Sequence, residues 1–129
     1  MEKLIASMAT AAHGLSLQSA RLRVTAENMA NADTPGYHRK ILTFETVATG
    51  DGGTLPLPGP VTFSRAELPR IHDPSHPMAD AEGYYEGSNV ELMLEVADAR
   101  EAQRSYEANL RMLDQARQMA AGLLDLLRR

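Results

Sequence analysis

Apolar side chains recur with a helical period along the first quarter of the chain. From about Lys3 to Ala32 there is no proline, and Gly14 is the only glycine. Large apolar residues recur there every seven positions, at Met8, Leu15, Leu22 and Met29. A seven-residue apolar repeat is typical of a helix that presents one seam to a partner helix. We therefore predict a long helix over residues 3–32.

A second apolar stripe runs along the same predicted helix. Leu17 and Val24 follow the seam positions by two residues, which places them about 200° round the helix. An ordinary three-helix core would also produce two apolar faces. However, about 30 residues span about 45 Å, whereas a typical globular helix has about 11 to 12 residues. The length favours neighbouring molecules as the cover of this second face.

A sharp elbow is predicted after this helix. Pro35 has no N–H and disfavours the α conformation at Thr34, and Gly36 readily takes the positive φ of a type II turn. Alternating β-prone residues then predict a strand over residues 37–47.

The middle of the chain is rich in turn-forming residues. Residues 49–60 contain four glycines and three prolines, which predicts a flexible loop, followed by a short strand over residues 61–64. Residues 71–87 predict further turns, with a strand at Tyr84–Tyr85. We expect residues 37–87 to form a small insert of β structure and loops.

A second long helix is predicted from Ser88 to about Leu127. Ser88 and Glu91 have the spacing of a capping box, in which each side chain bonds the backbone N–H of the other residue. The helix that follows contains no proline, and most positions of one heptad-like stripe are apolar, at Leu92, Val96, Ala99, Tyr106, Leu110, Leu113, Ala120, Leu124 and Leu127.

The end of this second helix is apolar on more than one face. Eleven of the eighteen residues from Leu110 to Leu127 are apolar, so this segment must be buried on most sides, and one partner helix covers one side. We expect other molecules to supply the missing cover. The residues predicted to form the assembly surface are Met8, Leu15, Leu17, Leu22, Val24, Met29, Leu92, Val96, Tyr106, Leu110, Met112, Leu113, Met119, Leu123, Leu124 and Leu127.

These patterns predict a mainly α fold. The long N- and C-terminal helices (residues 1–36 and 88–129) are expected to pair as an antiparallel coiled-coil-like domain, with the β and loop insert (residues 37–87) between them. A chain of 129 residues fits this single domain, and the abundance of Ala, Leu and Met over aromatics agrees with closely packed helices.

Charge and composition exclude several classes of partner. The formal net charge is −4 with both signs interspersed, which is not the electrostatic pattern of a protein that binds nucleic acid or an anionic membrane. No cysteine is present, so disulfides and thiolate metal sites are excluded. No stretch approaches the roughly 18 to 20 apolar residues of a membrane span. We do not expect residues 1–15 to be a cleaved signal peptide, because helical periodicity continues beyond them.

One cluster of residues suggests metal binding. His72, Asp73 and His76 lie within five positions, but Pro74 and Pro77 keep them out of a helix, and no further ligand has a recognisable spacing. A proline-rich turn with solvated imidazoles is the expected structure. A small His/Asp metal-binding or hydrolase module is kept as the alternative.

No recognisable catalytic motif is present. The chain lacks a nucleophile elbow, a phosphate-binding loop and a dinucleotide fingerprint. Glu95, Asp98 and Glu101 have helical spacing, but Arg100 and Arg104 lie beside them, which favours a solvated salt-bridged face over an acid–base pair. We expect no catalytic residue, no cofactor and no bound metal.

Residues 27–37, Glu-Asn-Met-Ala-Asn-Ala-Asp-Thr-Pro-Gly-Tyr, resemble the N-terminal signature of the bacterial flagellar axial proteins, the rod, hook and hook-associated family. Within that family, residues 72–77, 79–84, 88–90 and 104–109 are similar to the proximal-rod type of subunit. The residues that carry the elbow signature are Asn28, Asn31, Asp33, Thr34, Pro35, Gly36 and Tyr37. The FlgB-type rod subunit, in which the same elbow occurs, is the alternative within the family.

The resemblance implies a structural subunit whose terminal helices form the inner domain of the flagellar rod. Its implied partners are other copies of itself, other rod subunits and the flagellar type III export apparatus, with no nucleic acid and no direct membrane insertion. Export without a cleaved signal to the rod, in the periplasmic space, is also implied. Repeated contacts between different patches of identical subunits generate an open helical array, and stiff helices suit the transmission of torque.

Overall fold

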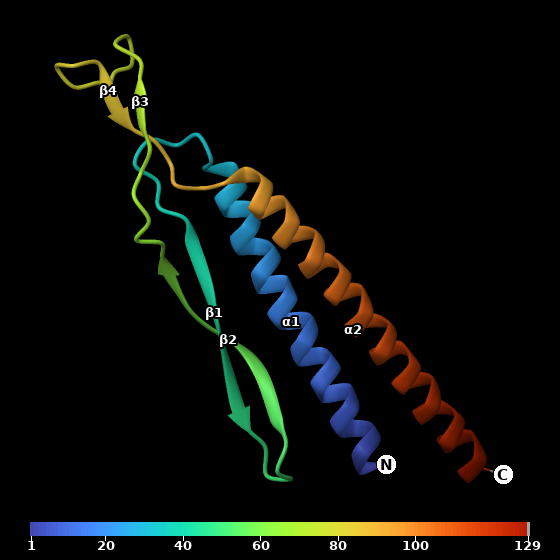
Figure 1. Cartoon of the computed structure of the whole chain (residues 1–129). Helices are drawn as coiled ribbons and strands as arrows, with labels where there is room; N and C mark the ends of the chain where they lie inside the picture. Colours follow the sequence, from blue (N-terminus) through green and yellow to red (C-terminus); the bar gives the residue numbers. More distant parts are fainter. Residues whose placement is uncertain (129) are drawn as a thin grey trace.

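The computed structural model describes residues 1–128 and contains two long helices with two small β ribbons between them (Figure 1). The elements in chain order are α1 (Glu2–Ala30), β1 (Lys40–Ala48), β2 (Thr54–Phe63), β3 (Arg70–His72), β4 (Tyr84–Glu86) and α2 (Leu92–Leu127). The helices lie side by side and run antiparallel, with both ends of the chain at the end of the helix pair away from the elbow. A mainly helical chain with a small β insert is thus confirmed.

Small and polar residues form the face where the helices meet. On α2 the buried residues are Glu95, Ala102 and Ala116, which lie seven or fourteen positions apart. On α1, Gly14 is buried, and a Cβ there would lie 2.6 Å from Asn109 Oδ1. The missing side chain at Gly14 therefore leaves room for the Asn109 side chain of α2.

The seam predicted on α1 lies one position away from the observed one. Gly14 and Asn28 are buried, whereas the large residues of the predicted seam, Met8, Leu15, Leu22 and Met29, are half-buried. Side chains of that size do not fit where the helices approach most closely, so they lie beside the contact.

The insert folds back along α1 and covers its second apolar stripe. Leu17 and Val24 are only 7% and 9% exposed. Both strands of the longer ribbon contact α1, and Ile41 and Leu42 of β1 line a small cavity together with Val24. The expectation that neighbouring molecules cover Leu17 and Val24 is therefore wrong, because the chain covers them itself.

The longer ribbon pairs β1 with β2 in antiparallel register. Val47 lies opposite Leu55, and Phe44 lies opposite Pro58. The flexible loop predicted over residues 49–60 is wrong from Thr54 onward. Three alternate prolines are tolerated in β2 because each strand of a two-stranded ribbon has a free edge, where no N–H is needed.

The shorter ribbon pairs β3 with β4 and projects beyond the elbow end of the helices (Figure 1). Ile71 lies opposite Tyr85, which confirms the strand predicted at Tyr84–Tyr85. Gly83 (φ 87°) ends the turn before β4, and a Cβ there would lie 2.9 Å from Pro74 Cγ. Neither helix is long and apolar enough, within residues 1–128, to cross a membrane.

The capping box predicted at Ser88 and Glu91 is wrong. Ser88 Oγ accepts a hydrogen bond from the Val90 N–H (3.1 Å), and α2 begins only at Leu92. Glu91 occupies the N-cap position with an extended backbone, and its side chain makes no capping hydrogen bond. The start of the helix is delayed because Asn89 is held in an extended segment by bonds to the insert.

Two helical glycines provide a matched test of the close helix contact. Gly14→Ala should lower the free energy of unfolding by about 1–2 kcal/mol, because the new Cβ meets the Asn109 side chain. A Cβ at Gly122 meets no atom within 4 Å, so Gly122→Ala should raise the free energy of unfolding by about 0.5–1 kcal/mol, the usual gain from Gly to Ala in a helix interior. Thermal unfolding followed by circular dichroism measures both. Equal stabilisation by the two substitutions would show that the Asn109 side chain does not fill the space beside Gly14.

Candidate assembly site

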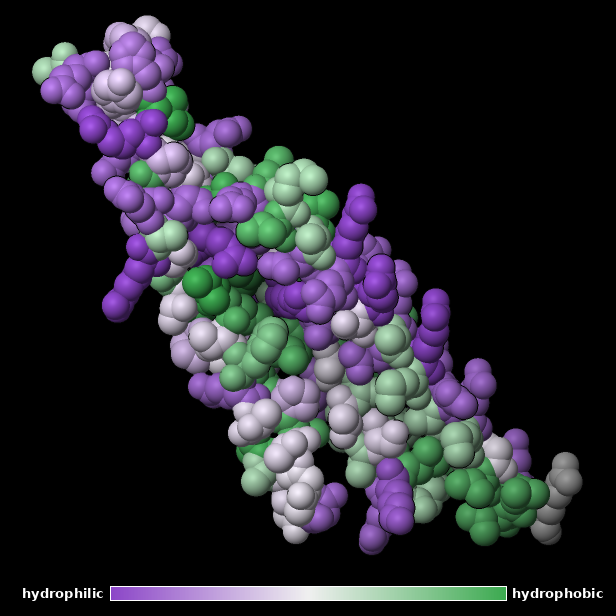
Figure 2. Space-filling view, viewed as in Figure 1, coloured by the Kyte–Doolittle hydropathy of each residue, from purple (hydrophilic) through white to green (hydrophobic). Residues whose placement is uncertain are grey.

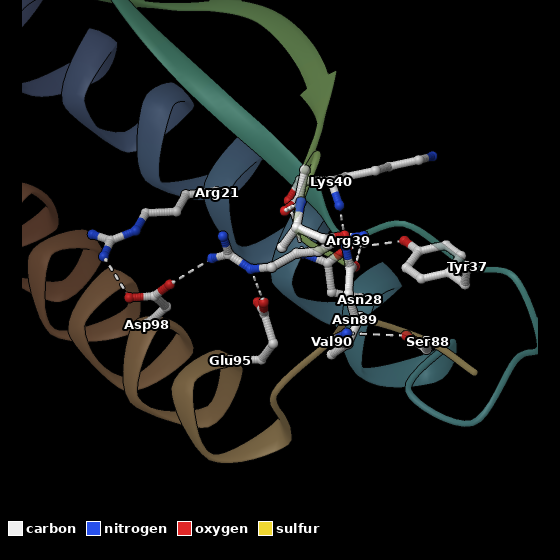
Figure 3. Close-up of polar contacts among 12 residues, drawn as sticks. Arg21, Asn28, Tyr37, Arg39, Lys40, Ser88, Asn89, Val90, Glu95 and Asp98 are labelled. Atoms are coloured by element: carbon white, nitrogen blue, oxygen red, sulfur yellow. Dashed lines mark hydrogen bonds and ion pairs between the residues drawn. The ribbon is translucent and has the colours of Figure 1, made fainter. Parts of the chain in front are cut away.

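The elbow depends on Asn28, which is fully buried in the last turns of α1 (Figure 3). Its Oδ1 accepts the Lys40 N–H at 2.9 Å, and its Nδ2 donates to the Lys40 carbonyl at 2.9 Å. One side-chain amide thereby pairs both backbone groups of the first residue of β1, as a neighbouring strand would. The direction in which β1 leaves the helix is fixed by these two bonds.

Tyr37 and the turn before it complete the elbow. The Tyr37 hydroxyl donates to Asn28 Oδ1 at 2.9 Å, and burial raises the pKa of Tyr37 above its ordinary value. The Tyr37 N–H donates to the Thr34 carbonyl at 3.2 Å, with Gly36 at φ 74°. The predicted turn is confirmed, and Gly36 has the positive φ expected of it.

Asn31 closes the end of α1. Its Nδ2 donates to the Glu27 carbonyl at 2.8 Å, and its Oδ1 accepts the Thr34 hydroxyl at 3.0 Å. Of the other predicted elbow residues, Pro35 is half-buried and Asp33 is exposed. The signature therefore consists of one buried amide (Asn28), one partly exposed amide (Asn31) and turn residues rather than of reactive side chains.

A second amide, that of Asn89, joins three segments of the chain. Its Oδ1 accepts the Arg39 N–H at 2.6 Å, and its Nδ2 donates to the Ala66 carbonyl at 3.0 Å. Its backbone N–H donates to the Tyr37 carbonyl at 3.2 Å. Asn89 belongs to the motif at residues 88–90, but its sequence neighbours do not predict this role, because its hydrogen-bond partners lie 23 to 52 residues away.

A buried ion pair ties the insert to α2. Arg39, the residue before β1, donates from Nε to Oε1 of Glu95, whose side chain is fully buried. The Arg39 Nη2 also lies 3.3 Å from Asp98 Oδ2. Separating this pair would leave a buried carboxylate without a counter-charge, which costs about 3–5 kcal/mol in comparable cases.

Arg21 extends the network to α1. Its Nη2 lies 3.6 Å from Asp98 Oδ1 and 3.2 Å from Glu101 Oε2. The helical spacing of these carboxylates predicts a solvated face paired with Arg100 and Arg104, and that prediction is wrong in its partners. The position of Glu95, seven residues before Ala102, was the signal that it faces α1.

The side chains of His72, Asp73 and His76, which suggested a metal site, do not point toward one common position. The His72 ring packs edge-on against Tyr84 (4.7 Å between centroids), and the His76 ring stacks on Tyr85 (3.9 Å). Asp73 accepts the Ser75 hydroxyl at 2.6 Å, and this bond is the main cause of its lowered pKa. Over residues 1–128 there is no group of three His, Cys, Asp or Glu side chains arranged to hold a metal ion.

Much of the predicted assembly surface is exposed to water. The exposed members are Leu92, Leu110, Met112, Met119, Leu123, Leu124 and Leu127. The half-buried members are Met8, Leu15, Leu22, Met29, Val96, Tyr106 and Leu113. Apolar side chains gather over the start of α2 and over its last turns (Figure 2). The structure thus leaves the apolar end of α2 uncovered.

The total surface is large for a chain of this size. The accessible area is 9118 Å², whereas a compact monomer of 14.1 kDa exposes roughly 6,700 Å². The buried hydrophobic residues are Ala11, Leu17, Val24, Ala102 and Ala116. The core is therefore small, and the surplus area of about 2,400 Å² is available for contacts with other molecules.

Comparisons with known proteins agree on one family. A family model described as flagella basal body rod protein matches residues 8–38, and one described as flagellar basal body rod FlgEFG protein C-terminal matches residues 81–126. The chain is 39% identical to the flagellar basal-body rod protein FlgC of Agrobacterium fabrum, over 99% of this chain and 98% of that protein. It is 33% identical to FlgC of Salmonella typhimurium (90% and 92% covered) and 27% identical to FlgC of Bacillus subtilis (93% and 95% covered).

Replacing the buried Asn28 by Asp should strongly destabilise the fold. Asn28→Asp keeps the volume but removes the donor to the Lys40 carbonyl and buries a charge, so the free energy of unfolding should fall by about 2–4 kcal/mol. Asn31→Asp, at a partly exposed amide, should cost about 1 kcal/mol. Urea denaturation measures both variants. Losses of equal size would mean that the Asn28 bonds do not hold the elbow.

The buried ion pair can be tested by removing its partners in turn. Arg39→Ala should lower the free energy of unfolding by about 3–5 kcal/mol, because Glu95 is left charged and unpaired. Adding Glu95→Gln should recover part of that loss, since the amide carries no charge. Lys40→Ala breaks the more exposed pair with Glu27 and should change the free energy of unfolding much less than Arg39→Ala, because water and salt screen an exposed pair. No recovery in the double variant would contradict a charge-driven loss.

Proposed function

The chain belongs to the FlgC type of flagellar basal-body rod proteins, and we propose that it joins its neighbours in the rod through the apolar surface of its two terminal helices. It is a structural subunit of the flagellar basal-body rod. The observation that carries the proposal is the exposure of the apolar end of α2, where Leu124 is 49% and Leu127 is 80% exposed. Contacts with neighbouring subunits would cover these side chains.

The available area supports more than one neighbour. A standard protein interface buries about 800 Å² on each partner, and the surplus here is about 2,400 Å². Different patches of one subunit can then meet different neighbours, which generates an open helical array rather than a closed ring. The proposed partners are other copies of this chain and other rod subunits.

The proposed domain division follows the same contacts. Residues 1–36 and 88–129 form the helical axial domain, in which α1 and α2 pair as an antiparallel coiled-coil-like unit, and residues 37–87 form the insert that packs on it. The seven-residue spacing of Glu95, Ala102, Asn109 and Ala116 supports the coiled-coil-like pairing. Within this domain, the large residues beside the seam and at the end of α2 supply the assembly surface.

A rod that transmits torque needs stiff subunits. Several contacts within this chain support such stiffness. The Asn28 and Asn89 amides and the Arg39–Glu95 pair join α1, the insert and α2 by directional bonds. Buried hydrogen bonds and ion pairs define one geometry, because any displacement leaves a polar group unpaired. In this proposal the subunit transmits torque and catalyses no reaction.

We further propose that the chain reaches the rod, in the periplasmic space, through the flagellar type III export apparatus without a cleaved signal. Removal of residues 1–15 would delete the first half of α1, including the buried Ala11 and Gly14. The FlgB type of rod subunit is not favoured, since the relatives reported above carry the name FlgC. The metal-binding alternative lacks converging ligands in the described residues.

Charge on the exposed apolar surface should block assembly without unfolding the chain. Leu124→Glu and Met112→Glu should each reduce incorporation into basal bodies at least tenfold, because a carboxylate would be buried against an apolar neighbour. Gln118→Glu, on an exposed polar position of the same helix, should incorporate normally. The measurements are motility of a deletion strain carrying each variant, and the amount of subunit in purified basal bodies.

The circular dichroism spectra of the three variants should match that of the unsubstituted chain, which separates an assembly defect from misfolding. Normal motility with Leu124→Glu and Met112→Glu would show that this surface does not take part in assembly.

A further inference from the structure

Two exposed methionines share one face of α2 near its end. Met112 and Met119 are 53% and 57% exposed. They lie seven residues apart, close to two full turns, so both side chains lie on the same side of the helix. Both line an apolar groove of about 450 Å³ beside the first turns of α1, together with Leu4 and Leu123. Two thioether groups therefore lie on an apolar surface that dissolved molecules can reach (Figure 2).

These thioethers differ from the other methionines of the chain. The sequence contains no cysteine, so methionine supplies the only sulfur that an oxidant can attack. Met8 and Met29 are half-buried, which hinders the approach of an oxidant to their sulfur atoms. Among residues 1–128, Met112 and Met119 are the methionines that are both exposed and part of the predicted assembly surface.

We propose that Met112 and Met119 form an oxidation site, at which conversion of the thioethers to sulfoxides blocks assembly of the subunit. The reagents are peroxides and hypohalous acids. With hydrogen peroxide, the O–O bond breaks, one oxygen atom bonds to sulfur, and the other leaves as water with both hydrogen atoms. Sulfur loses the two electrons that the peroxide gains. The effect on assembly rests on the proposed function, in which this end of α2 contacts neighbouring subunits.

The sulfoxide changes the character of this face of the helix. A thioether is apolar and adapts to the shape of a neighbouring surface, whereas a sulfoxide is polar. Burial of a polar group without a hydrogen-bond donor is unfavourable, so a neighbour that covers this face would bind the oxidised subunit less tightly. In the free subunit water can solvate both sulfoxides, because both side chains are more than half exposed. Oxidation should therefore leave the fold intact and weaken only contacts with other molecules.

Treatment of the purified chain with hydrogen peroxide tests the modification itself. Trypsin cleaves after arginine, which places Met112 and Met119 on separate peptides that mass spectrometry can quantify. Both should be oxidised several-fold faster than the half-buried Met8 and Met29, and the circular dichroism spectrum should not change. Equal oxidation rates at all four methionines would contradict the proposal, and so would a loss of helix that accompanies the oxidation of Met112 and Met119.

Glutamine imitates the oxidised side chain in cells, because it is similar in length and ends in a polar group. A chain carrying both Met112→Gln and Met119→Gln should be incorporated into basal bodies about tenfold less than the unsubstituted chain. Met78→Gln is the matched control, since Met78 is 64% exposed but lies between β3 and β4, outside the helix pair, and this variant should be incorporated normally. Normal incorporation of the double variant, or an equal loss in the control, would overturn the proposal.

Leucine at both positions separates the oxidation site from the proposed function. Met112→Leu with Met119→Leu keeps the surface apolar and similar in volume but leaves no sulfur there to oxidise. In a deletion strain without oxidant, this chain and the unsubstituted chain should restore motility equally. With hydrogen peroxide in the medium, incorporation of new subunits should fall several-fold for the unsubstituted chain and much less for the leucine variant. An equal response of the two strains to peroxide would overturn the oxidation site alone, whereas failure of the unsubstituted chain to restore motility without oxidant would overturn the proposed function.

Discussion

The two hydrogen bonds between the Asn28 amide and the backbone of Lys40 are the constraint on which the remaining structure depends. They fix the point and the direction at which the chain leaves α1 and enters β1. Side chains of successive residues in an extended segment point to opposite sides. Once Lys40 is held, Arg39 is directed toward α2, where Glu95 and Asp98 receive it. The ribbon then runs back along α1 and covers Leu17 and Val24.

The distribution of side-chain size follows from the same geometry. Gly14 of α1 packs against the Asn109 side chain, and Ala102 of α2 is buried, so the face between the helices holds small or hydrogen-bonded side chains. Larger apolar residues such as Leu15 and Leu124 lie beside the seam or beyond it. A protein that functions alone would place them inside, because each buried Leu or Met contributes about 1.5–3 kcal/mol to stability. In the proposed assembly, these residues contribute that stabilisation to contacts between subunits instead.

The sequence predicted the features whose causes are local. Helical periodicity gave both long helices to within a few residues, and Pro35 with Gly36 gave the elbow turn, because propensity and turn chemistry act over a few residues. The capping box at Ser88 failed because Asn89 is held by partners 23 and 50 residues away. The ion pair of Glu95 with Arg39 was missed for the same reason, since Arg39 lies 56 residues before it.

The polar contacts at the elbow and the apolar side chains at the ends of α2 serve different purposes. The polar joint at the elbow uses buried directional bonds, which tolerate one geometry and lose several kcal/mol when a partner is displaced. The ends of α2 carry Leu and Met side chains, whose contacts are non-directional and can repack against surfaces of different shape. In the proposed function, a rod subunit keeps one internal shape while it contacts both its own copies and other rod subunits. A rigid polar joint between adaptable apolar ends satisfies both requirements, and exchanging the two kinds of contact would satisfy neither.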